Sequence, residues 1–302
     1  MEVTPLAEVR PRPRRVAVGE FDGVHLGHRR VIAGADTVLT FEPHPAVVVH
    51  PERAPKLITS LAVKAELIAG LGVDELVVIP FDQGFAHQSP QEFIGHVLVE
   101  TLGATHVAVG DNFRFGHNAR GTTALLEQDG RFAVRVERLV EADGETISST
   151  RIRGLVAAGE MEEAGRLLGA PFRVRGPVVG GDRRGRDLGF PTANLVADPA
   201  LVLPAHGVYA CRATIPDPDP GAPDKATRTF MAATNVGVRP TFGGAGAPNV
   251  EAFLLDFSGD LYGQTITVEF LHRLRGEQRY EGIEPLVAQM QRDVGETRRR
   301  LS

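Results

Sequence analysis

The sequence predicts two domains, an α/β domain on a doubly wound parallel sheet and then an antiparallel β-barrel with a closing helix. Up to about Leu168, short β-branched runs alternate with helical stretches, which is typical of a parallel sheet with crossover helices. Beyond Phe172, alternating strands are separated by loops rich in glycine, proline and aspartate, a pattern typical of a barrel or sandwich. A length of 302 residues fits about two domains, which we place at residues 1–170 and 171–302.

The first domain is expected to hold strands at Arg15–Val18, Thr37–Phe41, Glu75–Ile79, His106–Val109 and Ala133–Val136. The run Leu76–Ile79 is apolar without interruption, as expected for a strand covered on both faces. Helices are predicted over Leu61–Gly70 and Pro90–Leu102, the second with an early proline and with Gly103 just past its end.

The first crossover of this domain is predicted to be short. Only Arg29–Asp36 separates His28 from the next strand, whereas a parallel crossover normally takes a dozen or more residues. We therefore expect a crossover that is either shortened to about two helical turns or rebuilt.

The second domain is expected to contain strands around Val208–Arg212, at Glu251–Phe257 and at Thr265–Phe270. The loop Pro216–Arg228 is predicted to be a flexible insertion between two strands. The last element begins at Glu284-Pro285 and is predicted to be an amphipathic helix whose final arginines, residues 298–300, oppose the helix dipole. Its apolar face is expected to carry Leu286, Met290, Val294 and Leu301.

Composition excludes several classes of protein. The 33 basic residues are outnumbered by 38 acidic ones, so nucleic acid is not expected as a partner. A nucleic-acid-binding regulator using the terminal arginines is an alternative that three tyrosines and no tryptophan disfavour. One cysteine, Cys211, cannot form an internal disulfide, and we find neither a signal peptide nor a membrane span, so we expect a cytoplasmic protein with no membrane partner. The sequence leaves self-association open.

A glycine-rich turn follows the first strand and leads into a helix. Such a turn offers free backbone N–H groups at the positive end of a helix dipole and so predicts an anion site. His25 and His28 are three residues apart, so both can donate to phosphate oxygens. A surface coincidence is the alternative, but the end of the first strand is where doubly wound sheets bind ligands. The expected phosphate-binding residues of this turn are Gly19, Phe21, Asp22, Gly23 and Gly27.

A second anion site is predicted at Ser149–Arg153, which begins a helix that ends at Gly159. Ser149 and Thr150 are expected to bind phosphate, with Thr150 as the N-cap, and Arg153 would point back over the same helix start. An ordinary cap with a solvated arginine is the alternative. Two such helix starts in one sheet domain favour a triphosphate over a monophosphate.

The densest motif of the chain runs from Gly180 to Asn194 and matches neither the phosphate loop nor the dinucleotide fingerprint. Its glycines allow close approach of phosphates, while the oxygens of Thr192 and Asn194 suit Mg²⁺ and its ATP. The residues expected at the phosphates are Gly181, Arg184, Gly185, Arg186, Gly189 and Pro191.

These motifs together resemble the bacterial FAD synthetase family, from about Val16 to Leu301. Gly19–His28 resembles the His-x-Gly-His nucleotidyltransferase signature and Ser149–Arg153 its partner across the ATP site. Gly180–Asn194 resembles the riboflavin kinase signature. Further similar segments follow in the family's order: Thr40–Pro45, Val109–Gly116, Asn235–Phe242, Val250–Phe253 and Asp256–Gly263.

The resemblance implies a nucleotidyltransferase-like first domain that joins FMN to the adenylyl group of ATP, and a second domain that phosphorylates riboflavin, both with Mg²⁺. The phosphate of FMN needs no base, so His25, His28, Arg153 and Mg²⁺ would spread the charge of the leaving pyrophosphate. Riboflavin offers a neutral alcohol, which requires a carboxylate base, and we choose Glu251. The flavin contacts expected from the resemblance are Pro43 and Asn112. Arg275 is a candidate for shaping the nucleotide or flavin site, with an ordinary surface arginine as the alternative.

The alternative is a monofunctional riboflavin kinase whose first domain is impaired by the short crossover. Intact His25, His28 and Arg153 argue against it. The sequence leaves open product inhibition, the preferred divalent metal and which half limits flux.

Overall fold

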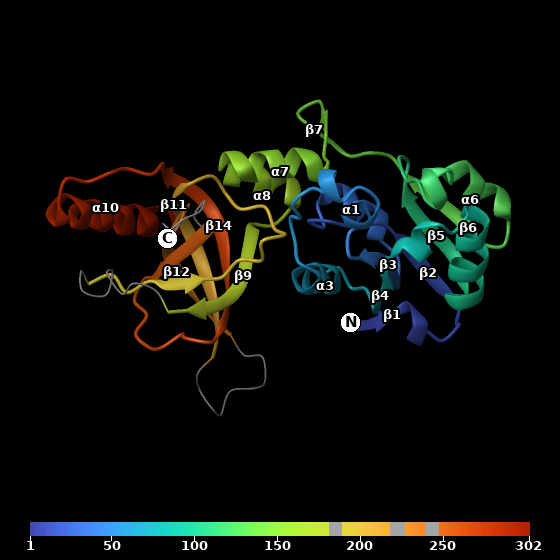
Figure 1. Cartoon of the computed structure of the whole chain (residues 1–302), viewed down its shortest axis with the longest axis horizontal. Helices are drawn as coiled ribbons and strands as arrows, with labels where there is room; N and C mark the ends of the chain where they lie inside the picture. Colours follow the sequence, from blue (N-terminus) through green and yellow to red (C-terminus); the bar gives the residue numbers. More distant parts are fainter. Residues whose placement is uncertain (181–188, 218–226, 239–247) are drawn as a thin grey trace. The chain divides into compact units, whose positions relative to one another are not determined.

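A parallel sheet of six strands forms the first part of the molecule, in the order β1-β4-β3-β2-β5-β6 (Figure 1). The computed structural model describes residues 1–180, 189–217, 227–238 and 248–302, and its contacts divide the chain into two units, Met1–Ser149 and Thr150–Ser302. The strands of the sheet are β1 (Glu2–Pro5), β2 (Arg14–Val18), β3 (Thr37–Glu42), β4 (Glu75–Pro80), β5 (Ala104–Gly110) and β6 (Ala133–Glu137).

The strand predictions for this unit are confirmed, and β1 is an addition that the sequence did not predict. β1 pairs with β4 through Glu2 and Glu75 at the edge of the sheet. Its four residues are too few, and too exposed, to show an alternating pattern.

Helices and short turns cover the two faces of this sheet. The predicted helices are confirmed as α3 (Leu61–Ala69) and as α5 (Pro90–Glu92), which continues into the π-helical segment η3 (Phe93–Thr101). The other elements of the unit are η1 (Leu6–Glu8), α1 (Leu26–Ile32), α2 (Pro45–Val49), η2 (Pro51–Arg53), α4 (Gln83–Ala86), η4 (His117–Ala119), α6 (Thr123–Asp129), β7 (Glu141–Ala142) and β8 (Glu145–Thr146).

Two apolar cores lie on the two faces of the sheet because neighbouring strand residues point in opposite directions. Leu39 and Val77 belong to one core, together with Leu98 of η3. Val38 and Leu76 belong to the other, together with Ile32 of α1 and Ile68 of α3. β4 is therefore covered on both faces, as its apolar run predicts.

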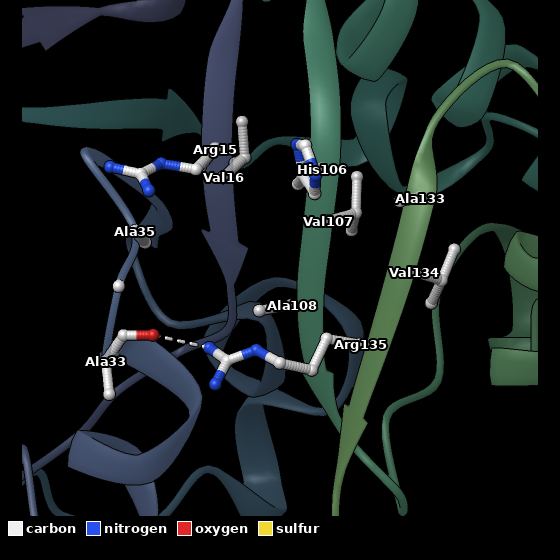
Figure 2. A pocket seen from close by; sticks show the side chains of 11 residues that line it. Arg15, Val16, Ala33, Ala35, His106, Val107, Ala108, Ala133, Val134 and Arg135 are labelled. Carbon is white, nitrogen blue, oxygen red and sulfur yellow. Dashed lines mark hydrogen bonds between the residues drawn. The ribbon is translucent and has the colours of Figure 1, made fainter.

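The short first crossover is confirmed, since α1 has 7 residues and joins the neighbouring parallel strands β2 and β3. A cavity of about 310 Å³ lies beside it, against β2, β5 and β6. Figure 2 shows Ala33 and Ala35, in the turn after α1, along one side of this cavity, and Arg135 reaching to the Ala33 carbonyl, a bond of 2.6 Å. A helix of two turns thus leaves part of this sheet face uncovered.

The second unit is built on a closed antiparallel barrel in the order β10-β13-β12-β11-β14-β9, which confirms the predicted barrel. Its strands are β9 (Phe172–Val179), β10 (Ala193–Leu195), β11 (Gly207–Pro216), β12 (Thr227–Val238), β13 (Pro248–Leu254) and β14 (Thr265–Arg275). Helices α7 (Ser149–Ala158) and α8 (Met161–Leu168) precede the barrel, and α10 (Ile283–Leu301) follows it.

Two predicted boundaries are wrong by a few residues. The strand expected to reach Phe257 ends at Leu254, because the chain turns at Asp256, whose φ is 60°. Thr150 is not the N-cap of α7, since the helix already includes Ser149. The predicted insertion Pro216–Arg228 lies mostly at residues 218–226, which are outside the described residues.

The closing helix α10 packs against β11, β12 and β14, and the face that it turns to the barrel is less apolar than predicted. Leu286, Met290 and Val294 are half-buried, while the most deeply buried residues are Asp293 and Thr297. Among the described residues, none of the helices combines the length and apolar composition that a bilayer span requires.

Candidate active sites

The loop between β2 and α1 has a strained backbone. Phe21, Gly23 and Val24 have positive φ values of 50°, 86° and 43°. Such values are uncommon for residues with a Cβ and are genuine outliers for a β-branched residue such as Val24. Phe21 and Val24, which carry a Cβ, each cost about 1–3 kcal/mol in this conformation. The surrounding residues must therefore hold the loop in place.

Several hydrogen bonds fix the loop, and most of them involve Asp22. The buried Asp22 carboxylate accepts the backbone N–H groups of Ile58 and Thr59 at 2.9 and 3.1 Å. Gly23 N–H donates to the Thr59 hydroxyl at 3.1 Å, and the Ser149 hydroxyl donates to the Asp22 carbonyl at 3.0 Å. Asp22 was predicted at the nucleotide phosphates; here its carboxylate anchors the loop that would hold them.

His25 and His28 lie together at the end of this loop. The Nδ1 atom of His25 accepts the backbone N–H of His28 at 3.3 Å, so His25 is the N-cap of α1. The two imidazoles are nearly parallel, with ring centroids 3.5 Å apart. Because Nδ1 of His25 accepts a hydrogen bond, its neutral ring carries the proton on Nε2, where it can be donated to an anion.

The glycines of the loop make room for these rings. A Cβ on Gly27 would lie 3.1 Å from the His25 ring, and a Cβ on Gly19 would lie 2.9 Å from the ring of Phe21. Phe21 in turn meets His28 edge to face, with centroids 5.4 Å apart. The glycine positions of the motif therefore serve ring packing as well as the turn.

His28 is held in its neutral form. Burial is the main cause that puts its pKa well below the usual value, followed by repulsion from His25 and Lys64. The Nδ1 atom of His28 is buried and has no hydrogen-bond partner among the residues that the structure describes. An anion bound beside this ring would be attracted to its charged form and so raise the pKa again.

A cavity of about 210 Å³ opens in front of the histidine pair, beside the ends of β2 and β5. This is the carboxyl edge of the sheet, where open α/β sheets bind their ligands. Of the residues predicted for this site, the cavity is lined by Phe21, His25, Gly27, His28, Asn112 and Ser149. It brings into one place residues that the sequence keeps more than a hundred positions apart.

The rest of the lining was not predicted from the sequence. It includes Glu20, Phe113 and the segment Arg138–Val140, which follows β6. Phe113 lies within Val109–Gly116, a segment that carries the family resemblance, so the sequence did indicate that it belongs to the site. The Arg138–Val140 segment carries no motif, and only the parallel pairing of β5 with β6 brings it to the cavity.

Pro43 lies just after β3 and is exposed. Its neighbour His44 connects this segment to the loop, because His44 Nε2 lies 2.6 Å from the Glu20 carboxylate. Asn112 is also exposed and follows the end of β5. The prediction that Pro43 and Asn112 contact the flavin remains a prediction.

Thr150 and Arg153 belong to the second unit and lie on α7 after Ser149. The Arg153 guanidinium donates to the Thr150 hydroxyl at 3.4 Å, so the two side chains share one face of the first turns. Both residues thus lie in the first turns of α7, the end of a helix that favours anions.

In the barrel, Asn194, Glu251 and Asn235 form a row across three strands. Asn194 of β10 is paired with Glu251 of β13, which is paired with Asn235 of β12. Val250 and Ala252 are completely buried, so Glu251 points away from the barrel interior, to the same side as its two partners. The Asn249 amide donates to the Glu251 carboxylate at 2.5 Å and orients it.

Thr192 stands two residues before Asn194 and is half-buried beside this row, while Pro191 is exposed. The hydroxyl of Thr192, the amide of Asn194 and the carboxylate of Glu251 are hard oxygen donors, which fit Mg²⁺. The described residues hold no cluster of three or more His, Cys, Asp or Glu side chains that could bind a metal by themselves. A cation here would therefore share its ligands with a nucleotide.

Gly189 has a φ of 85°, a conformation that favours glycine, and Phe190 packs against Phe253 with centroids 5.3 Å apart. The predicted phosphate-binding residues Gly181, Arg184, Gly185 and Arg186 lie outside the described residues.

Arg275 forms an ion pair with Asp293 of α10. Its Nη2 and Nε atoms lie 2.7 and 3.0 Å from the two carboxylate oxygens, and this pairing raises the Arg275 pKa. Tyr280 lies 6.0 Å from the guanidinium. The guanidinium thus ties β14 to the closing helix, and its predicted contact with flavin stays a prediction.

Comparison with known proteins finds a matching family for each half of the chain. Residues 8–151 match the family model of FAD synthetase, and residues 168–301 match that of riboflavin kinase. A relative named bifunctional riboflavin kinase/FMN adenylyltransferase from Listeria monocytogenes is 37% identical over 296 residues, which cover 94% of this chain and 91% of the relative. The relative of the same name from Pseudomonas fluorescens is 37% identical over 308 residues, covering 97% and 95%.

A solved structure shares the whole fold. The crystal structure named macrolide-efflux protein, from Streptococcus pneumoniae, has a TM-score of 0.86 and 31% sequence identity, and the match covers 99% of each chain.

Proposed function

The chain belongs to the family of bifunctional riboflavin kinases/FMN adenylyltransferases, and from this we propose which half of the chain catalyses each of the two reactions. The enzyme converts riboflavin to FMN and FMN to FAD. We assign FAD formation to the first half and riboflavin phosphorylation to the second, with the boundary at residues 170/171. The observation that carries this assignment is the match of two different family models to successive parts of one chain.

For FAD formation, we propose that ATP binds with its phosphates in the cavity beside the histidine pair. A phosphate oxygen of FMN attacks the α-phosphorus of ATP, and the bond to the departing pyrophosphate breaks. No base is required because the nucleophile is already an anion. Nε2–H of His25, the ring of His28 and the guanidinium of Arg153 would hold the negative charge that moves onto pyrophosphate. Mg²⁺ bound with ATP would neutralise part of the same charge.

The loop residues support this chemistry indirectly. The backbone bonds of Asp22 and Ser149 hold the strained turn, so the histidines meet the substrate without rearrangement. Gly19, Gly23 and Gly27 would allow the phosphates to approach, and Asn112 and Pro43 would contact FMN.

For riboflavin phosphorylation, we propose Glu251 as the general base. It would take the proton of the primary alcohol while the γ-phosphoryl group is transferred and ADP leaves. Thr192 and Asn194 would hold the Mg²⁺ that accompanies ATP, which fits the row that pairs Asn194 with Glu251. The other phosphate contacts would come from Gly181, Arg184, Gly185, Arg186, Gly189 and Pro191, with Arg275 near the flavin.

A monofunctional kinase is not favoured. The crossover helix is short, as expected, yet His25 and His28 lie beside a cavity at the correct edge of the sheet. The FAD synthetase match also spans residues 8–151, nearly the whole first unit. We propose a cytoplasmic enzyme whose partners are riboflavin, FMN and ATP.

The test is a time course with the full chain, riboflavin, ATP and MgCl₂, followed by chromatographic separation of the flavins. A parallel reaction starts from FMN. We expect FMN to appear before FAD in the first reaction, and FAD to form in the second. FMN that remains unchanged in the second reaction would reject the assignment for the first half while leaving the kinase intact.

A further inference from the structure

A buried lysine, Lys64, lies behind the loop that carries the histidine pair, and the proposed chemistry does not use it. Lys64 belongs to α3 and is 6% exposed. Its Nζ atom donates to the Glu20 carbonyl at 2.8 Å and lies 3.4 Å from the Thr40 hydroxyl. Because burial of an ammonium group is costly unless it is paired, its presence here indicates a specific role.

The Glu20 carbonyl is the point where the strained turn begins. It also accepts the Thr40 hydroxyl at 3.1 Å, so two side chains hold one carbonyl. The next residue, Phe21, already has a positive φ and packs against His28. A shift of Glu20 would therefore move Phe21 and, through the contact between the two rings, the imidazole of His28.

The charge of Lys64 is also directed at this loop. The carboxylates of Asp22, Glu42 and Glu20 attract the ammonium and oppose the fall in its pKa that burial causes. On the other side, the ammonium contributes to the low pKa of His28, after burial and His25. Lys64 is thus coupled to His28 both through the loop and through its charge.

We propose that Lys64 is a positioning residue for adenylyl transfer: through the Glu20 carbonyl it fixes the start of the loop and so sets where His25 and His28 meet the phosphates. The inference rests on the proposed function of the first half. Lys64 acts through the loop, and no contact with substrate is assigned to it.

The test replaces Lys64 with methionine, which has a similar length and neither charge nor donor. We expect kcat for FAD formation from FMN to fall about 10- to 100-fold, because a displacement near 1 Å can have that effect. Phosphorylation of riboflavin by the second half of the same chain should stay within two-fold of the wild type, which controls for protein quality.

Arg14→Met is the matched control. Arg14 is another buried cation of this sheet, 3% exposed, and its Nε donates to Glu75 at 3.0 Å at the opposite edge, where the strands begin. Its loss should lower the stability of the first unit without a comparable fall in kcat. If both variants lose FAD formation to the same extent at equal stability, Lys64 is only structural and the proposal is overturned.

A second measurement follows the His28 ring by NMR during a pH titration of the full chain. Lys64→Met should raise the pKa of His28, because one repelling cation is removed, whereas Arg14→Met should leave it unchanged. Thr40→Val removes the other bond to the Glu20 carbonyl and no charge, so it should lower kcat a few-fold without moving this pKa.

The outcomes separate the two proposals. Wild-type protein that forms no FAD from FMN contradicts the proposed function itself. Active wild type with an equally active Lys64→Met variant contradicts only the role of Lys64. If Lys64→Met does not fold, Thr40→Val decides, and an unchanged kcat in that variant overturns the proposal.

Discussion

His25 caps the helix that carries His28: its Nδ1 atom accepts the backbone N–H of His28 at 3.3 Å while the two rings stack with centroids 3.5 Å apart. One side chain thus fixes the start of α1 with its Nδ1 atom and packs its ring against that of His28. The structural and the chemical roles of His25 can be separated by substitution.

His25→Asn should retain the cap and lose the chemistry. Asparagine is among the best N-cap residues, so this variant should be about as stable as the wild type, while His25→Ala should lose about 1 kcal/mol. Both variants lack the ring and should lose at least tenfold in FAD formation, with riboflavin phosphorylation unchanged. Thermal unfolding and the two flavin assays provide the measurements. Full activity of His25→Asn would exclude a direct role for the ring.

The low pKa of His28 predicts that the first unit loses stability in mild acid. Above the unfolded pKa of about 6.5, His28 is neutral in both states. Below it, His28 binds a proton in the unfolded chain but stays neutral in the folded protein until the pH reaches its lower folded pKa. The free energy of unfolding therefore falls as pH falls from the unfolded to the folded pKa. By pH 5.5 the loss is on the order of 1 kcal/mol.

A comparison of wild type with His28→Gln at pH 7.5 and 5.5 measures this effect. The chain has no tryptophan, and its tyrosines, Tyr209, Tyr262 and Tyr280, all belong to the second unit. Tyrosine fluorescence therefore follows the second unit, while circular dichroism follows both. The variant should lose less stability than the wild type on acidification, and an equal loss in the two proteins would contradict the prediction.

The sequence was sufficient to predict the sheet and the barrel because their strands carry strong local signals. The apolar run of β4 and the alternation in β14 each reflect burial of one or both faces. β1 was missed because its place depends on pairing with β4, a contact about seventy residues away. Asp293 was missed on the buried face of α10 because only the pairing with Arg275 makes an aspartate favourable there.

The candidate sites likewise contain some residues that the sequence could predict and others that only the fold brings into place. Motif residues such as His25 and Asn194 could be found because their residue types and spacing are chemically specific. Lys64 could not, since a lysine in a predicted helix is normally expected in solvent, and only the fold brings it to the Glu20 carbonyl. The Asp22 carboxylate was recognised as part of the motif, but its use in anchoring the loop follows from the contact with residues 58–59.

Asp293→Asn should destabilise the second unit by up to about 3 kcal/mol, because it leaves the half-buried Arg275 guanidinium beside a neutral group. Asp256→Asn is a suitable control, since it breaks the ion pair of Asp256 with Arg298 on the surface of the same unit and should cost less than about 1 kcal/mol. Urea unfolding followed by tyrosine fluorescence measures both. Equal, small effects would show that the Arg275–Asp293 pair contributes little to closing the barrel with α10.

Glu251→Gln tests the base of the kinase reaction with minimal change in geometry. The Asn249 amide donates to one oxygen of Glu251, and glutamine keeps an oxygen that can accept this bond. Loss of a general base typically costs about 10²- to 10⁴-fold, so kcat for riboflavin phosphorylation should fall by that amount while FAD formation from FMN stays the same. Asn194→Ala should raise the KM for ATP in the same reaction, because its proposed partner is the metal of the nucleotide. A Glu251→Gln enzyme with the wild-type rate would show that the alcohol loses its proton to another group, and the row of Asn194, Glu251 and Asn235 would then bind substrate without taking part in proton transfer.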